Sequence, residues 1–364
     1  MKLLVLATDY PKQNESVALM YIHTRNKYYV QNGFDVTVIN FRARMNYLID
    51  GVKVITLREY QTNQNKYDIL ISHAPNIRNH FLFLNKYSKN FSDIVFFFHG
   101  HEVLKISDTY PEPYGYMKKI ALFSLIIQEL YDSFKLRLWN NYLRKILNNA
   151  HFIFVSKWMH DMFIKYVQLD PNVIKSKSHI IYNSVGKNFE KYDYDTSSEK
   201  EFDFITIRNN LDDSKYSIDI VSKIANSNSN YKFCVIGKGQ FFQNNEKPNN
   251  LIWIDKNLRH DEVISYLNKS KCALMPTRTD AQGVMACEMA TFGIPLITSD
   301  IEVCKEVFTD FENIGFIDNE EIELDITPIY EKLLSKSEIT KRKKYFAEYT
   351  IGKEIELFKK INIT

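Results

Sequence analysis

The chain has 364 residues, more than a single hydrophobic core usually serves, so two domains are expected. Its 47 basic and 44 acidic residues give a formal net charge of +3, which excludes the strongly basic composition typical of nucleic-acid-binding proteins. A hydrophobic fraction of 45% excludes general disorder, and no window approaches the roughly 18 consecutive apolar residues of a membrane-spanning helix.

The chain begins with a short apolar run, Leu3–Ala7, that leads directly to Asp9 and Pro11. This pattern indicates a buried strand rather than a signal peptide. All four cysteines lie in the second half of the chain, without a CxxC pair or a metal-ligand spacing. Reduced thiols and a cytoplasmic protein are therefore expected.

In the first half, short β-branched or aromatic runs alternate with amphipathic stretches, which is typical of a parallel sheet with helical crossovers. The stretch Val17–Gln31, closed by Gly33, is predicted to be the first crossover helix. The predicted strands, most of them apolar throughout as in a sheet covered on both faces, are Leu3–Thr8, Asp35–Asn40, Val52–Leu57, Ile69–Ser72, Ile94–Phe98, Phe152–Val155 and His179–Tyr182.

A basic, aromatic-rich stretch, Tyr114–Leu147, is predicted to form a helix pair. Such a pair can lie on an anionic bilayer, or its apolar face can belong to the core while its charges are solvated; both interpretations stay open. The apolar residues at helical spacing are Phe123, Ile127, Leu130, Phe134, Leu138 and Trp139, and the charged ones are Lys118, Lys119, Lys135, Arg137, Arg144, Lys145, Glu129 and Asp132.

The polar stretch 190–201 has no apolar periodicity and is predicted to be a linker between a first domain, 1–189, and a second domain, 202–340. The stretch Glu338–Lys360 is helical by periodicity, so the end of the chain, 341–364, is expected to be a helix that can pack back on the first domain. In the second domain the predicted strands are Phe202–Ile207, Lys232–Ile236, Leu251–Ile254, Ala273–Met275 and Pro295–Thr298, and the predicted helices are Ser217–Asn226, His260–Lys269 and Gly283–Phe292.

The most informative stretch runs from Pro276 to Pro295, where a strand is followed by a loop and a helix. Ligands of open α/β sheets bind beyond the carboxyl ends of the strands, which places this loop at a binding crevice. The backbone N–H groups of Gly283 and Val284, at the helix start, can receive phosphate oxygens. Glu288, further along the same helix, would direct a carboxylate toward a ribose diol.

This stretch resembles the E-x7-E signature of retaining family 4 glycosyltransferases, whose GT-B fold has two Rossmann-like parallel-sheet domains facing across a cleft. Asp280 and Glu288 keep the spacing, with Asp280 where the family usually has Glu. The resemblance implies that Asp280 contacts hydroxyls of the donor sugar and that Glu288 holds the ribose. Two acids at this spacing mean little alone; the strand, the loop and the glycines around the helix favour the functional interpretation.

Two further stretches resemble the same family. Arg208 and Lys215, after a predicted strand, match its diphosphate-binding cations, which neutralise charge on the leaving nucleotide. Taken alone, such loop cations are usually solvated. Gly237 and Gly239 match a Gly-x-Gly turn that allows close backbone approach, and an ordinary tight strand-to-helix turn is the alternative.

In the first half, the strand Ile94–Phe98 delivers His99, His101 and Glu102 to the carboxyl edge of the sheet. The resemblance assigns His99 to the donor sugar near the reacting centre. His101 and Glu102 either fix the loop or face the acceptor, and His73, after another strand, is a weaker acceptor-side candidate.

Two positions depart from the family pattern. The loop Tyr10–Ser16 has no glycine where the family often has a Gly-rich loop, and it can serve the acceptor instead. Asn183 falls at the family's Asn-Gly hinge, with Ser184 in place of the Gly.

The resemblance implies transfer of a hexose-type sugar from a nucleotide diphosphate, with UDP favoured, to a hydroxyl of a glycan or lipid-linked oligosaccharide, as in bacterial surface polysaccharide assembly. The configuration would be retained. The cations at 208 and 215 and the acids at 280 and 288 are expected to converge on this one donor. Peripheral contact with the inner face of the plasma membrane would come from residues 114–147.

No Asp-x-Asp clamp is identifiable, so neither a metal nor another cofactor is expected. An inverting transferase or epimerase with a general base near His99 is one alternative. A non-catalytic sugar-nucleotide-binding protein is another, suggested by Asp280 and the missing glycine loop. A nicotinamide dehydrogenase is disfavoured because no GxGxxG opens a helix after the first strand.

Overall fold

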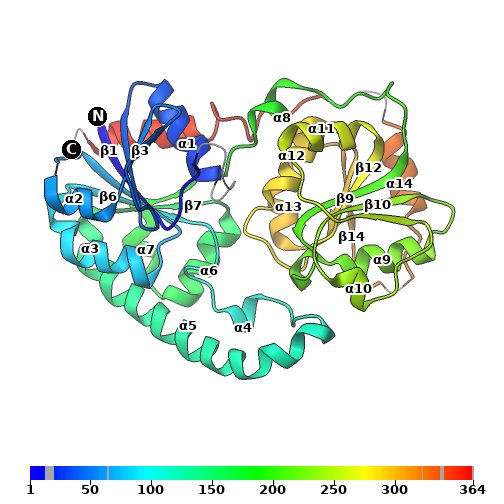
Figure 1. Ribbon diagram of the computed structural model, residues 1–364, viewed down its shortest axis with the longest axis horizontal. Coiled ribbons are helices and arrows are strands. Elements are labelled where there is room, and N and C mark those ends of the chain that lie inside the picture. The colour runs from blue at the N-terminus through cyan, green and yellow to red at the C-terminus, as the bar shows by residue number, and fades with distance from the viewer. Residues whose placement is uncertain (13–19, 64, 322, 337–339, 363–364) are drawn as a thin grey trace. The chain divides into compact units, whose positions relative to one another are not determined.

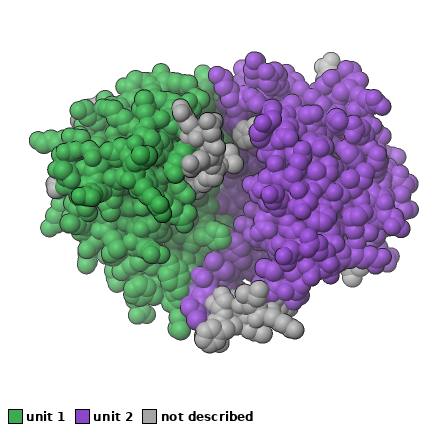
Figure 2. Space-filling model, viewed as in Figure 1, with its two compact units in different colours: residues 1–105, 130–184, 347–364 green, residues 106–129, 185–346 purple. Residues whose placement is uncertain are grey.

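The computed structural model describes residues 1–12, 20–63, 65–321, 323–336 and 340–362 (Figure 1). The chain divides into two compact units, shown in different colours in Figure 2. Unit 1 comprises residues 1–105, 130–184 and 347–364, and unit 2 comprises residues 106–129 and 185–346. Residues 106–129 and 185–189 of the predicted first domain, 1–189, belong to unit 2, and the predicted terminal segment 341–364 divides after 346.

Unit 1 contains an eight-stranded sheet in the order β3-β4-β2-β1-β5-β6-β7-β8. Neighbouring strands are parallel except β3 and β4. Buried apolar side chains fill most strands, as expected of a sheet covered by helices on both faces (Figure 1). The strands are β1 (Lys2–Ala7), β2 (Asp35–Asn40), β3 (Tyr47–Ile49), β4 (Val52–Ile55), β5 (Ile69–His73), β6 (Asp93–Phe98), β7 (Ala150–Phe154) and β8 (Ser178–Ile180).

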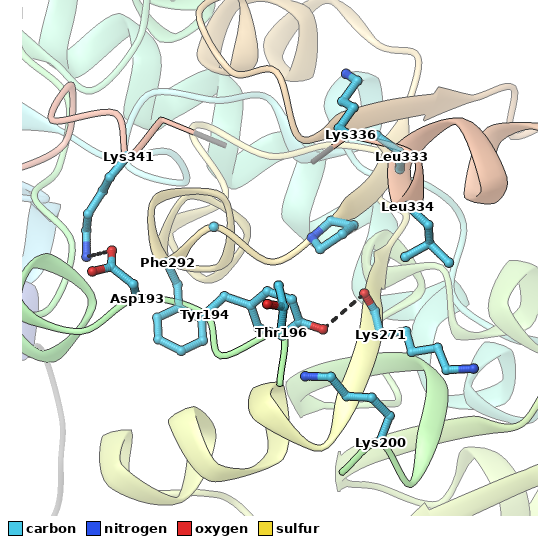
Figure 3. A pocket seen from close by; sticks show the side chains of 12 residues that line it. Asp193, Tyr194, Thr196, Lys200, Lys271, Phe292, Leu333, Leu334, Lys336 and Lys341 are labelled. Atoms are coloured by element: carbon cyan, nitrogen blue, oxygen red, sulfur yellow. Dashed lines mark hydrogen bonds and ion pairs between the residues drawn. The ribbon is translucent and has the colours of Figure 1, made fainter. Parts of the chain in front are cut away.

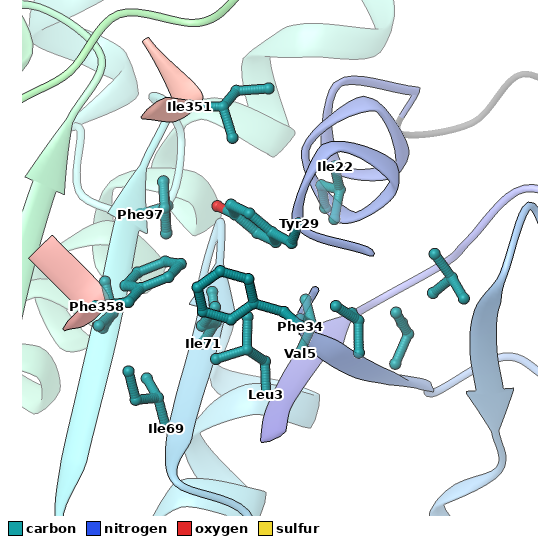
Figure 4. Close-up of a cluster of buried hydrophobic side chains, with 14 of the residues drawn as sticks. Leu3, Val5, Ile22, Tyr29, Phe34, Ile69, Ile71, Phe97, Ile351 and Phe358 are labelled. Carbon is teal, nitrogen blue, oxygen red and sulfur yellow. The ribbon is translucent and has the colours of Figure 1, made fainter. Parts of the chain in front are cut away.

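The helices of unit 1 include α15 from the end of the chain, whose apolar side packs into the core beside α1. Figure 4 shows the rings of Tyr29, Phe34 and Phe358 gathered against the sheet. The fully buried Arg25 and Glu354, one on each of these two helices, form an ion pair at 2.9 Å. The helices are α1 (Met20–Gln31), α2 (Leu57–Asn63), α3 (Leu82–Tyr87), α6 (Lys157–Val167), α7 (Pro171–Ile174), α15 (Ile351–Ile361) and the second part of α5 (Lys118–Ile146).

Two helix predictions need correction or fall partly outside the described residues. The helix predicted over Glu338–Lys360 begins only at Ile351, and residues 337–339 are not described. Tertiary contacts override the helical periodicity before it, since the carbonyl of Tyr345 accepts from the Val185 N–H and its hydroxyl donates to the Val307 carbonyl. Residues 17–19 of the first predicted helix and 13–16 of the loop before it also lie outside the described residues.

Unit 2 contains a six-stranded parallel sheet in the order β11-β10-β9-β12-β13-β14. This is the 3-2-1-4-5-6 order of a dinucleotide-binding sheet, with the direction of winding changing between β9 and β12. The strands are β9 (Phe202–Asn210), β10 (Phe233–Lys238), β11 (Leu251–Ile254), β12 (Ser270–Met275), β13 (Leu296–Ser299) and β14 (Ile314–Ile317). The helices are α4 (Ile106–Thr109), the first part of α5, α8 (Lys187–Lys191), α9 (Ile218–Ser227), α10 (Phe241–Asn244), α11 (His260–Asn268), α12 (Val284–Phe292), α13 (Glu302–Phe308) and α14 (Thr327–Leu334).

The predicted linker is fastened to unit 2 rather than left free. The Tyr194 N–H donates to the Phe292 carbonyl, and the Tyr194 hydroxyl donates to the Ser270 carbonyl at 2.7 Å. Lys200 donates to the Asn268 carbonyl. The segment therefore packs against the ends of α11 and α12.

The helix pair predicted over 114–147 is one continuous helix, α5. The side chains of residues 118–126, including Lys118, Lys119 and Phe123, lie outside the described part. Beyond them, Trp139 is fully buried, whereas Leu130 and Phe134 are 68% and 60% exposed. The helix thus contributes to the core and also presents apolar side chains at the surface. Within the described residues, no helix combines the length and apolarity needed to cross a bilayer.

Candidate functional site

The carboxyl ends of β9 and β12 bring together the two loops predicted to bind a donor. Arg208 lies near the end of β9, and the loop 276–283 follows the end of β12. Gly283 sits at the N-terminus of α12 with a φ of 72°, in the left-handed region that glycine adopts without strain. Because the two strands are neighbours at the switch in winding direction, both loops border the place where ligands of such sheets bind.

The two predicted cations share one aromatic ring, that of Tyr216. The Arg208 guanidinium carbon lies 4.8 Å from the ring centroid, and the Lys215 ammonium also lies 4.8 Å from it. Arg208 is almost completely buried; it donates to the Pro276 carbonyl at 2.8 Å, but its Nε has no hydrogen-bond partner among the described residues. A buried, unsatisfied guanidinium N–H is costly, which is a property expected of a site for an anion.

The Asp280 carboxylate acts on both cations. Burial lowers the pKa of Arg208, and Asp280 opposes this change. Burial also lowers the pKa of Lys215, but the Tyr216 phenol and then the carboxylates of Asp213 and Asp280 outweigh it, so the Lys215 pKa is raised. Both cations are charged, since the Lys215 pKa is raised and an arginine guanidinium is not deprotonated in proteins. The structure groups three of the predicted residues, Arg208, Lys215 and Asp280.

Asp280 also holds its own loop. Its Oδ1 accepts the N–H of Gly283 at 2.8 Å and that of Gln282 at 3.2 Å. The Gly283 N–H, predicted to bind phosphate, is therefore already donated to a carboxylate. The N–H of Val284 belongs to the first turn of α12, whose N–H groups have no acceptor within the helix.

The environment of Glu288 differs from that of Asp280. It is 5% exposed, and its Oε1 accepts the Gly186 N–H at 2.9 Å. Burial raises the pKa of Glu288 to about 7, although this hydrogen bond lowers it. The structure thus places Glu288 on the same helix as Gly283 but against the backbone that enters unit 2 at Val185.

Sequence reasoning missed the residues that fasten the two loops to each other. The Arg278 guanidinium makes two bonds, at 2.8 and 2.6 Å, to the carboxylate of Asp219, and the Arg278 N–H donates to the Lys215 carbonyl. The Thr277 hydroxyl donates to the same carbonyl at 3.0 Å. Arg278 lies inside the informative stretch Pro276–Pro295, but its partner Asp219 is 59 positions away in sequence. No local pattern therefore predicts this ion pair.

The two glycines of the predicted Gly-x-Gly turn pack against the protein itself. A Cβ at Gly237 would lie 2.1 Å from the Arg208 carbonyl oxygen, and one at Gly239 would lie 3.1 Å from the Asp212 carboxylate. Close approach of β10 to the end of β9 therefore requires glycine at 237.

In unit 1, His73 and His99 lie side by side at the carboxyl ends of β5 and β6. His73 Nδ1 and His99 Nε2 are 3.3 Å apart. Burial, with a contribution from the nearby Arg25 charge, lowers the pKa of both histidines well below the usual value. Both imidazoles are thus neutral at pH 7, so they can exchange hydrogen bonds with hydroxyls but supply no positive charge.

Hydrogen bonds with Glu102 and Lys135 fix the loop after β6. Glu102 Oε1 accepts the N–H groups of His99 and Gly100. The buried Lys135 ammonium donates to the carbonyl of His101 at 2.8 Å. Of the two interpretations for Glu102, fixing the loop is therefore the one its contacts favour, and the His101 side chain is exposed.

A separate pocket of about 420 Å³ lies at the opposite edge of the unit 2 sheet, near the amino ends of β12 and β13 (Figure 3). Its lining includes four lysines, among them Lys271, paired with Asp203, and Lys341, paired with Asp193. None of the predicted site residues lines it. Within the described part of the chain, no group of three or more His, Cys, Asp or Glu gathers as metal ligands would.

Comparison with known families finds a match in the second half of the chain. Residues 197–351 match the model of the family Glycosyl transferases group 1. An uncharacterized 41.2 kDa protein in the cps region of Klebsiella pneumoniae is 26% identical over 155 residues. That match spans 39% of this chain and 42% of the relative.

Three solved structures are similar over almost the whole chain. Sucrose-phosphate synthase from Thermosynechococcus elongatus has a TM-score of 0.69 at 12% identity, covering 99% of this chain and 98% of that one. Anabaena HepE in complex with UDP has a TM-score of 0.62 at 13% identity, covering 100% of this chain and 98% of that one. WaaG, a glycosyltransferase involved in lipopolysaccharide biosynthesis, has a TM-score of 0.58 at 11% identity, covering 92% of this chain and 91% of that one. The predicted GT-B fold, with two parallel-sheet α/β domains, is thereby confirmed.

Proposed function

From the glycosyl transferases group 1 domain in residues 197–351, we propose that the chain is a retaining glycosyltransferase. In this proposal it moves a hexose-type sugar from a nucleotide diphosphate to a hydroxyl of a glycan or lipid-linked oligosaccharide. Unit 2 binds the donor, and its diphosphate contacts Arg208, Lys215 and the start of α12.

The observation that carries this proposal is the pair of cations at the switch in winding direction. Arg208 and Lys215 are held over one ring, and the Arg208 Nε is buried without a partner among the described residues. A diphosphate supplies acceptor oxygens for both groups, and guanidinium–phosphate hydrogen bonds are among the strong ones. Asp280, beside them, is proposed to accept from hydroxyls of the sugar.

The proposed chemistry is a front-face displacement. The bond between the anomeric carbon and the phosphate oxygen breaks, the acceptor oxygen bonds to the same carbon from the same face, and the acceptor proton passes to the leaving phosphate oxygen. Arg208 and Lys215 stabilise the negative charge that develops on the diphosphate. His99, as a neutral imidazole, is proposed to contact the donor sugar. His73, whose Nδ1 lies 3.3 Å from His99 Nε2, is proposed to orient the His99 ring.

UDP is the proposed nucleotide, and HepE, one of the similar structures, was solved with UDP. Surface polysaccharide assembly is the proposed setting, in keeping with the named roles of WaaG and with the genomic region of the Klebsiella relative. No metal or other cofactor is included in the proposed reaction. Full activity after exhaustive treatment with EDTA is the expected result.

The donor site is tested by isothermal titration with UDP, GDP and ADP. Lys215→Ala is expected to weaken binding of the preferred nucleotide roughly 10- to 100-fold, because a hydrogen bond to a charged group contributes about 1.5–3 kcal/mol. Lys223→Ala, at an exposed position on α9, is the matched control. Equal affinity in Lys215→Ala and the wild type would refute the proposed contact between Lys215 and the diphosphate.

The reaction is tested separately from binding. NMR of the product formed from a UDP-sugar of α configuration should show an α linkage. A β linkage would favour the inverting alternative, and nucleotide binding without acceptor-dependent release of UDP would favour the non-catalytic one.

Contact with an anionic membrane surface is proposed for α5. Ile127, Leu130 and Phe134 are at least half exposed and recur three and four positions apart, on one face of the helix. The exposed Arg137 follows on the same face, so apolar side chains and a positive charge lie together as in interfacial helices.

Vesicle co-sedimentation tests this contact. The wild type should bind vesicles that contain phosphatidylglycerol more than pure phosphatidylcholine vesicles, and Phe134→Ser should reduce that binding. Leu82→Ser removes an equally exposed apolar side chain from α3 and should not. Equal loss in both variants would argue against a specific face on α5.

A further inference from the structure

The segment 106–117 lies between the His99 loop and α5 in sequence, yet it belongs to unit 2. We refer to residues 106–117 as the tyrosine strap. Pro111 and Pro113 fix their own φ angles and disfavour helix at the residues before them, Tyr110 and Glu112. The two prolines therefore restrict the backbone between Tyr110 and Tyr114.

Tyr114 contacts the start of α9 and the ion pair that fastens the donor loops. Its hydroxyl donates to Asp219 Oδ1 at 3.0 Å and accepts the Ile218 N–H at 3.1 Å. Asp219 is also the partner of Arg278. The Tyr114 ring packs edge-on against Phe241, with 4.9 Å between the ring centroids.

The other two strap tyrosines contact the same loop at its start and at Lys215. The Tyr116 hydroxyl donates to Asp212 Oδ1 at 2.6 Å, and that carboxylate also accepts the Gln240 N–H. The Lys215 ammonium lies 5.4 Å from the centroid of the Tyr110 ring and 4.8 Å from that of Tyr216. The strap thus touches the loop 212–219 at both of its ends and at its cation.

We propose that the tyrosine strap is a positioning element that holds the loop 212–219, with Lys215, in the geometry that receives the donor diphosphate. This inference rests on the proposed donor site. A loop ordered before the ligand arrives loses less conformational entropy on binding, so the strap strengthens donor affinity without touching the donor. Its tyrosines are therefore positioning residues and not catalytic ones.

The test is to remove single hydroxyls from the strap in the full chain. Tyr114→Phe and Tyr116→Phe should each raise the Kd for UDP about 5- to 10-fold, the effect of losing a hydrogen bond of about 1–1.5 kcal/mol. The KM for the donor should rise while kcat and the KM for the acceptor stay unchanged. Tyr231→Phe is the control, since its hydroxyl bonds to Thr327 elsewhere in unit 2.

Hydrogen exchange of residues 212–219 without nucleotide is the second measurement. Faster exchange of these residues in Tyr114→Phe than in Tyr231→Phe supports the strap proposal, even if none of the tested nucleotides binds. Absence of nucleotide binding would refute only the proposed donor site. If Lys215→Ala loses nucleotide affinity while the strap variants keep both wild-type Kd and wild-type exchange, the donor site stands and the strap proposal is overturned. A lower melting temperature with an unchanged donor KM would also overturn it, because it would indicate a merely structural role.

Discussion

Glu288 makes the stability of unit 2 dependent on pH. Its carboxyl is buried and accepts one backbone N–H, from Gly186, and burial raises its pKa to about 7 from an ordinary value of 4.5. Below pH 4.5 the group is protonated in both the folded and the unfolded chain. Between pH 4.5 and 7 the unfolded chain loses the proton first, so the folded state loses relative stability as the pH rises, and above pH 7 the loss is complete.

The size of this loss follows from the two pKa values. An interval of 4.5 to about 7 corresponds to about 3 kcal/mol, because each pH unit is worth about 1.4 kcal/mol. Glutamine at 288 retains an oxygen for the Gly186 N–H and cannot ionise. Glu288→Gln should therefore gain stability relative to the wild type between pH 4.5 and 8, by an amount equivalent to roughly 6–12 °C in the midpoint of a domain of this size.

Thermal unfolding of both proteins without nucleotide, at half-unit steps from pH 4.5 to 8, measures the difference. The subtraction cancels every other titrating group shared by the two chains. The control is Glu331→Gln, the same substitution at an exposed position of α14. A difference between Glu288→Gln and wild type that stays constant across this range would refute the argument that burial dominates the titration of Glu288.

Two further substitutions test the packing that supports the candidate site. Arg25→Met leaves Glu354 buried without its ion-pair partner and should cost about 3–5 kcal/mol of stability in urea denaturation, whereas Lys157→Met, at an exposed ion pair, should cost less than about 1 kcal/mol. Gly237→Ala would place a Cβ 2.1 Å from the Arg208 carbonyl oxygen, so a backbone shift costing about 1–3 kcal/mol and weaker UDP binding by calorimetry are expected.

Most of the two sheets could be predicted because their strands are short apolar runs buried on both faces. The bounds of β2 and β11 coincide with the predicted ones. β3 and β14 were missed for physical reasons. β3 has three residues and exposes Leu48, and β14 contains Gly315, so neither carries the continuous apolar pattern of a central strand.

The location of the candidate site could also be predicted, but its pairings could not. A strand followed by a loop and a helix start fixes where Asp280 lies relative to its own sheet, and the same is true of Arg208 at the end of β9. Their proximity depends on β9 and β12 being neighbours, a long-range pairing that no local pattern records. The contact of Glu288 with Gly186 is 102 positions apart in sequence and has no local signal either.

Loop cations usually are solvated, and Tyr216 explains why Arg208 is buried here and Lys215 is partly buried. A cation loses hydration when it is placed against an aromatic face, and the ring offsets part of that cost electrostatically. Both Arg208 and Lys215 lie against the ring. The part of the desolvation cost that the ring does not offset is that of the Arg208 Nε, which is buried without a partner among the described residues. An anion that bonds to this N–H removes that cost, so this arrangement favours the binding of a diphosphate.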